Sequence, residues 1–139
     1  MSTSVFVNLP VKDVRRSIAF FSALGFKFDP RFTNDDAAGL IIEEGHSYAM
    51  LLTHKHFKSF IKNEIADPGK VTQVLVALSF GSREEVDGIV RKAVAAGGKD
   101  AREPQDHGFM YGRAFADPDG HVWEPFWMDP NANPAQQGA

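Results

Sequence analysis

The chain contains no cysteine, which excludes disulfide bonds, thiolate metal ligands and a cysteine nucleophile. It also has no apolar run of the roughly 20 residues that a membrane-spanning helix needs, and residues 1–11 lack the basic segment of a secretion signal. Lysine and arginine are scattered, and the formal net charge is -3. We therefore predict a cytoplasmic protein with no nucleic-acid partner and no membrane partner.

The chain does have enough apolar residues for a hydrophobic core. It is 139 residues long and 43% hydrophobic, which is the usual size for one domain. We expect a single domain over residues 1–128. Residues 129–139 are rich in proline, asparagine, glutamine and glycine and have little to bury, so we predict a flexible tail there.

The first half of the chain predicts a strand, a helix and three strands, which we call module 1 (about 4–53). Asp13 can cap the helix and Gly25 can end it in the left-handed conformation. The predicted strands are residues 4–11, 26–32, 39–43 and 47–53. A connector helix is expected over residues 54–66, with Phe57, Phe60 and Ile61 on one face.

The same order recurs in module 2 (about 72–128). Ser82 and Glu85 form a capping-box pattern at the start of its helix, and Gly97 ends that helix. The predicted strands are residues 72–80, 99–102, 109–116 and 121–127. The repeat of this order predicts an α+β fold built from two βαβββ modules.

Three segments resemble the glyoxalase/bleomycin-resistance/extradiol-dioxygenase superfamily, also called vicinal oxygen chelate proteins, over roughly residues 4–128. They are residues 9–13 with the helix positions up to Phe26, the helix 82–98, and above all residues 116–124, Ala-Asp-Pro-Asp-Gly-His-Val-Trp-Glu. The resemblance implies curved mixed sheets around a cavity that takes a small-molecule ligand, and a homodimer. It also implies glyoxalase-type lyase or isomerase activity, dioxygenase activity, or binding without chemistry, as in bleomycin resistance.

The resemblance further implies a divalent metal held by His, Gln or Glu at four positions. By motif, these positions fall on Phe6, Met50, Leu75 and Glu124, of which only Glu124 is a conventional ligand. A shift of register would place Gln73 at the third position. Two donors make a poor site, so we expect no cofactor; if a metal such as Zn, Ni, Fe or Mn is bound, Glu124 and Gln73 would hold it.

Several polar residues are candidates for catalysis or binding. Glu124 could act as a general base, or could pair with Arg113 or water. His107, Tyr111 and Arg113 could converge on an anionic ligand, or Arg113 could instead pair with an acid such as Asp117. Asn8 could orient a substrate carbonyl or make a structural hydrogen bond.

Apolar residues at or near the former ligand positions are candidates to line the cavity and to favour a flat, apolar or aromatic ligand. They are Phe6, Met50, Leu52, Leu75, Ala77, Met110 and Phe126. For each residue alone, ordinary core packing is the alternative.

Three functions remain open from the sequence. The first is a metal-dependent enzyme of the lactoylglutathione lyase or dioxygenase type. The second is a metal-free protein that binds a small molecule. The third is metal-free enolate chemistry, in which Glu124 or His107 removes a proton while Arg113 and Asn8 stabilise the enolate. The count of metal ligands favours the second and third.

Overall fold

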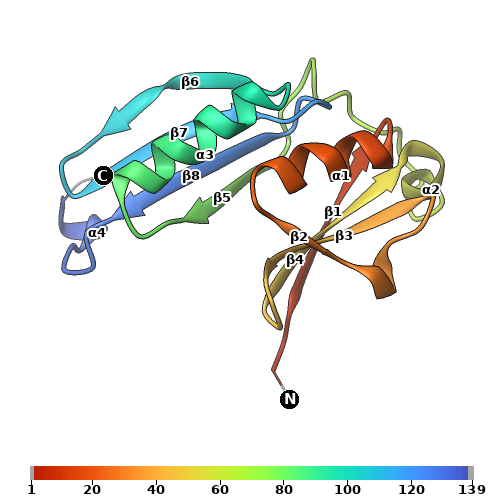
Figure 1. Ribbon diagram of the computed structural model, residues 1–139, viewed down its shortest axis with the longest axis horizontal. Coiled ribbons are helices and arrows are strands. Elements are labelled where there is room, and N and C mark those ends of the chain that lie inside the picture. The colour runs from red at the N-terminus through yellow and green to blue at the C-terminus, as the bar shows by residue number, and fades with distance from the viewer. Residues whose placement is uncertain (1, 138–139) are drawn as a thin grey trace. The chain divides into compact units, whose positions relative to one another are not determined.

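The computed structural model describes residues 2–137 and divides into two compact units, with the boundary between Val71 and Thr72. Each unit holds one four-stranded mixed sheet with a long helix against one of its faces (Figure 1). The predicted α+β fold of two βαβββ modules is therefore confirmed. That the two modules make one domain over residues 1–128 stays a prediction.

In the first unit the sheet order is β1-β4-β3-β2. Its elements are β1 (Val5–Val11), α1 (Val14–Ala23), β2 (Lys27–Asp29), the 3-10 helix η1 (Pro30–Phe32), β3 (Ala37–Glu43), β4 (Ser47–Thr53) and α2 (His54–Lys58). Strands β1 and β4 are parallel, and the other neighbours are antiparallel. Strands β2 and β3 pair over fewer residues than the other neighbours in this sheet.

The second unit repeats this arrangement in the order β5-β8-β7-β6. Its elements are β5 (Leu75–Ser79), α3 (Arg83–Ala95), β6 (Lys99–Asp106), β7 (Met110–Ala116), β8 (Val122–Met128) and α4 (Pro134–Gln137). Strands β5 and β8 are parallel, as β1 and β4 are in the first unit. Of the predicted flexible tail, residues 134–137 form α4, and residues 138–139 lie outside the described part of the chain.

The two long helices begin and end at the residues that the sequence indicates. The Asp13 carboxylate accepts hydrogen bonds from the backbone N–H groups of Arg15 and Arg16, and Gly25 follows α1 with a φ of 101°. At α3 only one of the two hydrogen bonds of the predicted capping box forms. Ser82 Oγ accepts from Glu85 N at 3.2 Å, but the Glu85 carboxylate accepts from Gly81 N and not from Ser82 N.

Two predictions for the first unit are wrong in extent. The strand predicted over residues 26–32 ends at Asp29, because Pro30 begins η1 and the Asp29 carboxylate accepts from Arg31 N. The connector helix predicted over residues 54–66 stops after five residues. A helix that short depends on packing of its apolar face, and Phe60 on that predicted face is 70% exposed.

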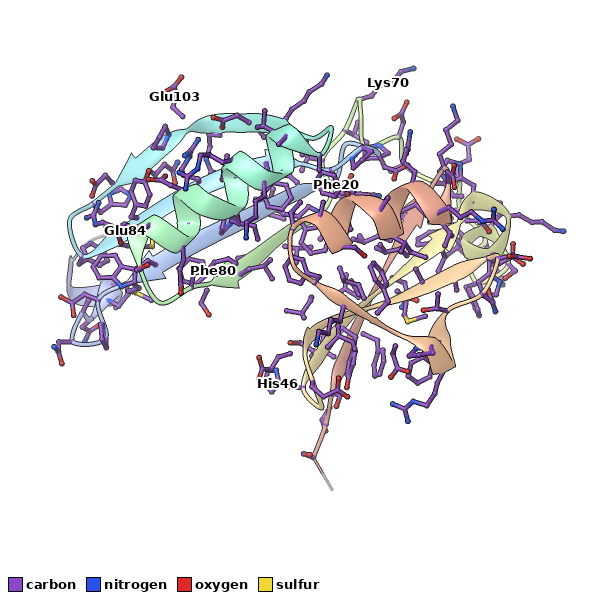
Figure 2. All side chains as sticks on the ribbon, viewed as in Figure 1. Phe20, His46, Lys70, Phe80, Glu84 and Glu103 are labelled. Carbon is purple, nitrogen blue, oxygen red and sulfur yellow. The ribbon has the colours of Figure 1, made fainter. Side chains whose placement is uncertain are left out.

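Two strands of the second unit also differ from the prediction. Strand β5 starts at Leu75 instead of residue 72, and β6 continues to Asp106 instead of ending at Arg102. The extra length of β6 is polar and contains Pro104, which hid it in the sequence. An edge strand tolerates both features, and the Glu103 side chain indeed projects away from this edge (Figure 2).

The core of each unit lies between its sheet and its long helix. In the first unit Leu9, Leu40 and Leu51 are at most 3% exposed and pack on the side of Phe20 and Phe21 of α1. In the second unit, Val86 and Val90 of α3 face the fully buried Phe115 and Trp123. No helix within residues 2–137 is long and apolar enough to cross a membrane.

Candidate functional site

Each sheet has a near face, which packs against its long helix, and a far face, which does not. Alternation along β1 and β4 puts Phe6 and Asn8 on the far face of the first sheet, where strand pairing places them beside Tyr48 and Met50. Leu52 lies further along the same face. The apolar residues that the sequence singled out in module 1 therefore share one surface.

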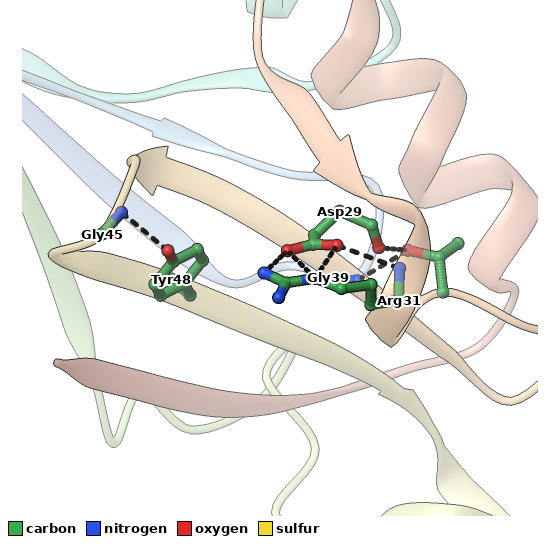
Figure 3. Close-up of polar contacts among 6 residues, drawn as sticks. Asp29, Arg31, Gly39, Gly45 and Tyr48 are labelled. Carbon is green, nitrogen blue, oxygen red and sulfur yellow. Dashed lines mark hydrogen bonds and ion pairs between the residues drawn. The ribbon is translucent and has the colours of Figure 1, made fainter.

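The far face of the first sheet carries a cluster of aromatic rings. The Phe6 ring stacks on the Tyr48 ring with centroids 4.6 Å apart, and the edge of Phe32 approaches Phe6 at 6.0 Å. The Tyr48 hydroxyl accepts a hydrogen bond from Gly45 N at 2.7 Å (Figure 3). Phe6 remains 42% exposed, so a flat ring surface is accessible beside the strand. His46, in the same turn, is exposed (Figure 2).

Phe32 is held in this cluster by the polar turn that follows β2. The Arg31 guanidinium bonds both oxygens of the Asp29 carboxylate, at 2.7 Å for the shortest contact (Figure 3). It also lies over the Phe32 ring at 5.3 Å. The hydrogen bonds from Arg31 lower the pKa of Asp29. Thr33 Oγ1 donates to the Asp29 carbonyl and accepts from Gly39 N. The acid on this strand is thus satisfied by its own neighbours.

A hollow of about 330 Å³ lies at the other end of the same face. It is lined by Asn8 and Leu52 from the sheet and by Phe57, Phe60 and Ile61 from the connector. The Asn8 amide donates only a long bond, 3.3 Å, to the carbonyl of Phe6. The sequence indicated Asn8 and Leu52, but it treated the three connector residues as a helix face. Only the folded connector shows that they form a wall.

The far face of the second sheet carries an ion pair in an otherwise apolar surface. Arg102 Nη1 of β6 donates to the Glu124 carboxylate of β8. Ala77 lies beside Glu124, and Ala114 lies beside Arg102. The apolar residues predicted here, Leu75, Met110 and Phe126, are on the same face by alternation. Glu124 faces away from Trp123 as predicted, but its partner is Arg102 and not Arg113. Arg102 carried no signal in the sequence.

Tyr111 and Arg113 lie on the near face, against α3. The Tyr111 hydroxyl donates to the Asp87 carboxylate at 2.7 Å, and Arg113 bonds Asp87 and Asp100 at 2.8 Å each. These bonds, with Tyr111 first and Arg113 second, lower the pKa of Asp87, and Asp87 in turn raises the pKa of Tyr111. The alternative that paired Arg113 with Asp117 is wrong.

The three predicted catalytic residues are consequently not brought together. Glu124 lies on the far face and Arg113 lies on the near face. His107 lies in the exposed turn between β6 and β7, where its backbone N–H donates to the Met110 carbonyl at 2.8 Å. Asp117 organises the turn before β8 instead. Its buried carboxylate accepts from His121 N and from Trp123 Nε1 at 3.1 Å, and burial raises its pKa.

The donor set does not fit a divalent metal. At the positions that the resemblance implies, Phe6 and Leu75 have no donor atom, Met50 has only a thioether, and Glu124 is engaged by Arg102. Gln73 lies in the exposed segment before β5. Within residues 2–137, no three His, Asp or Glu side chains are grouped so that they could hold an ion.

The family model described as "Glyoxalase/Bleomycin resistance protein/Dioxygenase superfamily" matches residues 4–124. This chain belongs to that superfamily. It is 31% identical to a hypothetical protein from S. aureus of known structure, with a TM-score of 0.75 over 91% of this chain and 95% of that one. No curated protein matches the chain.

More distant structures share the fold. A glyoxalase/bleomycin resistance protein/dioxygenase family enzyme from Burkholderia phytofirmans PsJN is 21% identical, with a TM-score of 0.72 over 88% of this chain and 96% of that one. A bleomycin resistance determinant encoded on the transposon Tn5 is 18% identical, with a TM-score of 0.62 over 92% of this chain and 99% of that one. One of these two proteins is a family enzyme and the other a resistance determinant, so the same fold carries different functions.

Proposed function

We propose that this protein binds a small apolar or aromatic compound on the far face of its first sheet, without a resident metal. The observation that carries the proposal is the hollow of about 330 Å³, whose walls are apolar except for one amide, that of Asn8. Small-molecule sites are mostly apolar concavities with a few polar groups that orient the ligand. The exposed ring of Phe6, on the same face, adds a surface on which a flat ligand can stack.

A second hollow of the first unit fits such a ligand less well. It measures about 350 Å³ and lies at the start of α1, between Asp13, Arg15 and the residues Asn34 and Asp35. Four of its six lining residues are polar, and the Asp13 carboxylate already caps α1. We therefore assign the ligand to the hollow beside Asn8.

The experiment titrates the full chain, labelled with ¹⁵N, with the neutral aromatic probe 2-naphthol and follows the amide resonances by NMR. We expect saturable shifts at the side-chain amide of Asn8 and the backbone amide of Phe60. Because Phe60 is 70% exposed, Phe60→Ser should barely change stability but weaken binding roughly three- to tenfold, the scale of one aromatic contact.

Val71→Ser is the matched control, since Val71 is an exposed apolar residue of the same unit that does not line the hollow. It should bind the probe like the wild type. Equal affinity of Phe60→Ser and the wild type would contradict the assignment of the hollow. Elemental analysis of the purified protein tests the proposal that it holds no resident metal. Stoichiometric zinc, nickel, iron or manganese would contradict that proposal.

The ion pair on the second sheet favours one further candidate function, which is metal-free proton transfer next to a carbonyl group. Glu124 would take the proton and Arg102, in place of the Arg113 that the sequence suggested, would stabilise the enolate. The test follows the exchange of a substrate's protons next to its carbonyl group for solvent deuterium. The exchange should persist in the presence of a chelator and be lost in Glu124→Gln. The homodimer implied by the resemblance also stays a prediction. Sedimentation velocity, which reports the oligomeric state, tests it.

A further inference from the structure

Arg102 makes fewer hydrogen bonds than the other arginines whose ion pairs are described. Arg31 and Arg83 each bond both oxygens of a carboxylate, and Arg83 also donates to the Gly108 carbonyl. Arg113 donates from Nη1 to Asp87 and from Nη2 to Asp100. Arg102 donates from Nη1 to Glu124, and its Nη2 has no acceptor among residues 2–137.

The contrast with Arg113 is informative because both arginines lie near the middle of neighbouring strands. Arg113 has two carboxylates and a side chain that is only 16% exposed. Arg102 has one carboxylate and a side chain that is 34% exposed, and its Nε is buried without a partner, as is that of Arg113. A half-buried guanidinium is most stable when its donors are matched by acceptors. Arg102 therefore lacks the second acceptor that Arg113 has.

The side chains that flank the pair on the neighbouring strands are small. The residue beside Arg102 on β7 is Ala114, and the residue beside Glu124 on β5 is Ala77, which is exposed. Leu75, 53% exposed, lies on the same face one step further along β5. Small side chains next to the charges and a large apolar side chain further out suit a ligand with a polar head and an apolar body.

We infer that Arg102 is a ligand-binding residue that recognises the carboxylate of a small apolar or aromatic acid. The ligand carboxylate accepts from Nη2 of Arg102, as Asp100 accepts from Nη2 of Arg113, and its apolar part lies over Ala77 toward Leu75. Glu124 holds the guanidinium in place from the other side. A monoanionic carboxylate is favoured over a phosphate monoester, because the latter brings nearly twice the negative charge toward Glu124.

This inference concerns the second sheet and does not rest on the hollow beside Asn8. The experiment uses the full ¹⁵N-labelled chain and records the Nε–H resonance of Arg102, identified by its loss in Arg102→Lys. The probes are 4-phenylbutyrate and its neutral counterpart 4-phenylbutyramide. We expect the carboxylate to shift the Arg102 resonance saturably and to bind at least about tenfold more tightly than the amide, because a charge-assisted hydrogen bond is lost.

Variants separate recognition by Arg102 from a general effect of charge. Arg102→Gln should lose about tenfold or more in affinity for 4-phenylbutyrate, and Arg102→Lys should recover only part of it, since an ammonium lacks the planar fork. Lys92→Gln, an exposed cation on α3, is the matched control and should leave the affinity unchanged.

Three results would overturn the inference. They are an Arg102 resonance that 4-phenylbutyrate does not move, equal binding of the acid and the amide, and wild-type affinity in Arg102→Gln. If Arg102→Gln does not fold, the wild-type resonance and the acid–amide comparison still decide. Shifts at Asn8 and Phe60 without a shift at Arg102 would leave the proposed function standing and refute only the carboxylate site.

Discussion

The two units share strand order and a parallel pairing at the same place, β1 with β4 and β5 with β8, but differ in the chemistry of their far faces. Pairing of β1 with β4 places Asn8 beside Met50, and the equivalent pairing of β5 with β8 places Ala77 beside Glu124. The first face therefore has the Asn8 amide among aromatic and apolar side chains, with the ion pair Asp29–Arg31 at its edge strand. The second face has the pair Arg102–Glu124, which reaches from the edge strand to an inner strand. The same backbone supports two different surfaces.

The edge strands explain much of this difference. Asp29 on β2 pairs with Gly39, and Arg102 on β6 pairs with Ala114, so the two charged residues occupy equivalent positions. Asp29 is neutralised within its own turn by Arg31, whereas Arg102 pairs with Glu124, 22 residues further along the chain, across the sheet. Asp29 is therefore matched at the edge of its sheet, whereas the ion pair of Arg102 crosses the far face of the second sheet.

The near faces should dominate the stability of each unit, which leaves the far faces free to diverge. Trp123 is fully buried and donates its indole N–H to Asp117. We expect Trp123→Ala to lower the free energy of unfolding by about 3–5 kcal/mol. Val122→Ala, one residue earlier but on the far face, should cost only about 1 kcal/mol. Urea denaturation compares the two, and equal losses would contradict the division into near and far faces.

The glycines on the two far faces should respond differently to an added methyl group. A Cβ on Gly39 would lie 2.8 Å from Cβ of Phe32, so Gly39→Ala should cost about 1–3 kcal/mol through overpacking. A Cβ on Gly112 would lie 3.8 Å from Cβ of Phe126, an ordinary contact. Gly112→Ala should therefore be neutral or stabilise by about 0.5–1 kcal/mol. Thermal unfolding of both variants checks this, and a stable Gly39→Ala would show that Phe32 is not fixed over the sheet.

Tyr48 tests whether the aromatic cluster of the first unit also anchors its hairpin. Tyr48→Phe keeps the ring stacked on Phe6 but removes the acceptor for Gly45 N. We expect a loss of about 0.5–1.5 kcal/mol, the net value of one hydrogen bond. Faster amide hydrogen exchange confined to Gly45 is the expected signature. Unchanged exchange there would mean that the turn holds without the hydroxyl.

The smallest expected effect concerns acid stability of the second unit. The Arg83 guanidinium and then the Gly108 N–H lower the pKa of Asp106 from 3.8 to about 2. Because the folded pKa lies below the unfolded one, this contribution is complete above pH 3.8 and is lost as the pH falls toward 2. Asp106→Asn removes this contribution, so the stability of the variant should fall less steeply than that of the wild type between pH 3.8 and about 2. Near neutral pH the two proteins should show the same pH dependence of stability. Denaturation series at several acidic pH values measure it, with Glu103→Gln as an exposed control on the same strand.

The elements that follow from local rules could be predicted. The caps at Asp13 and Ser82, the glycines after α1 and α3, and the alternation of β4 each depend on residues close in sequence. The extent of β6 could not be predicted, because its polar residues are ordered only by pairing with β7. The helix predicted for the connector was too long, because a helical pattern with little packing against the rest of the protein does not stay helical.

The candidate site divides in the same way. The sequence alone determined that the chain consists of two βαβββ modules and that the family's metal positions are apolar except at Glu124. It also determined that Phe6 and Asn8 share one face of their strand and that Met50 and Leu52 share one face of theirs, because residue type and alternation are local properties. Only the tertiary structure decided that Tyr111 and Arg113 bond α3, that Phe57, Phe60 and Ile61 wall a hollow, and that Arg102 meets Glu124. These contacts join segments far apart in the chain, and which segments meet is set by strand pairing and helix packing and not by any local pattern.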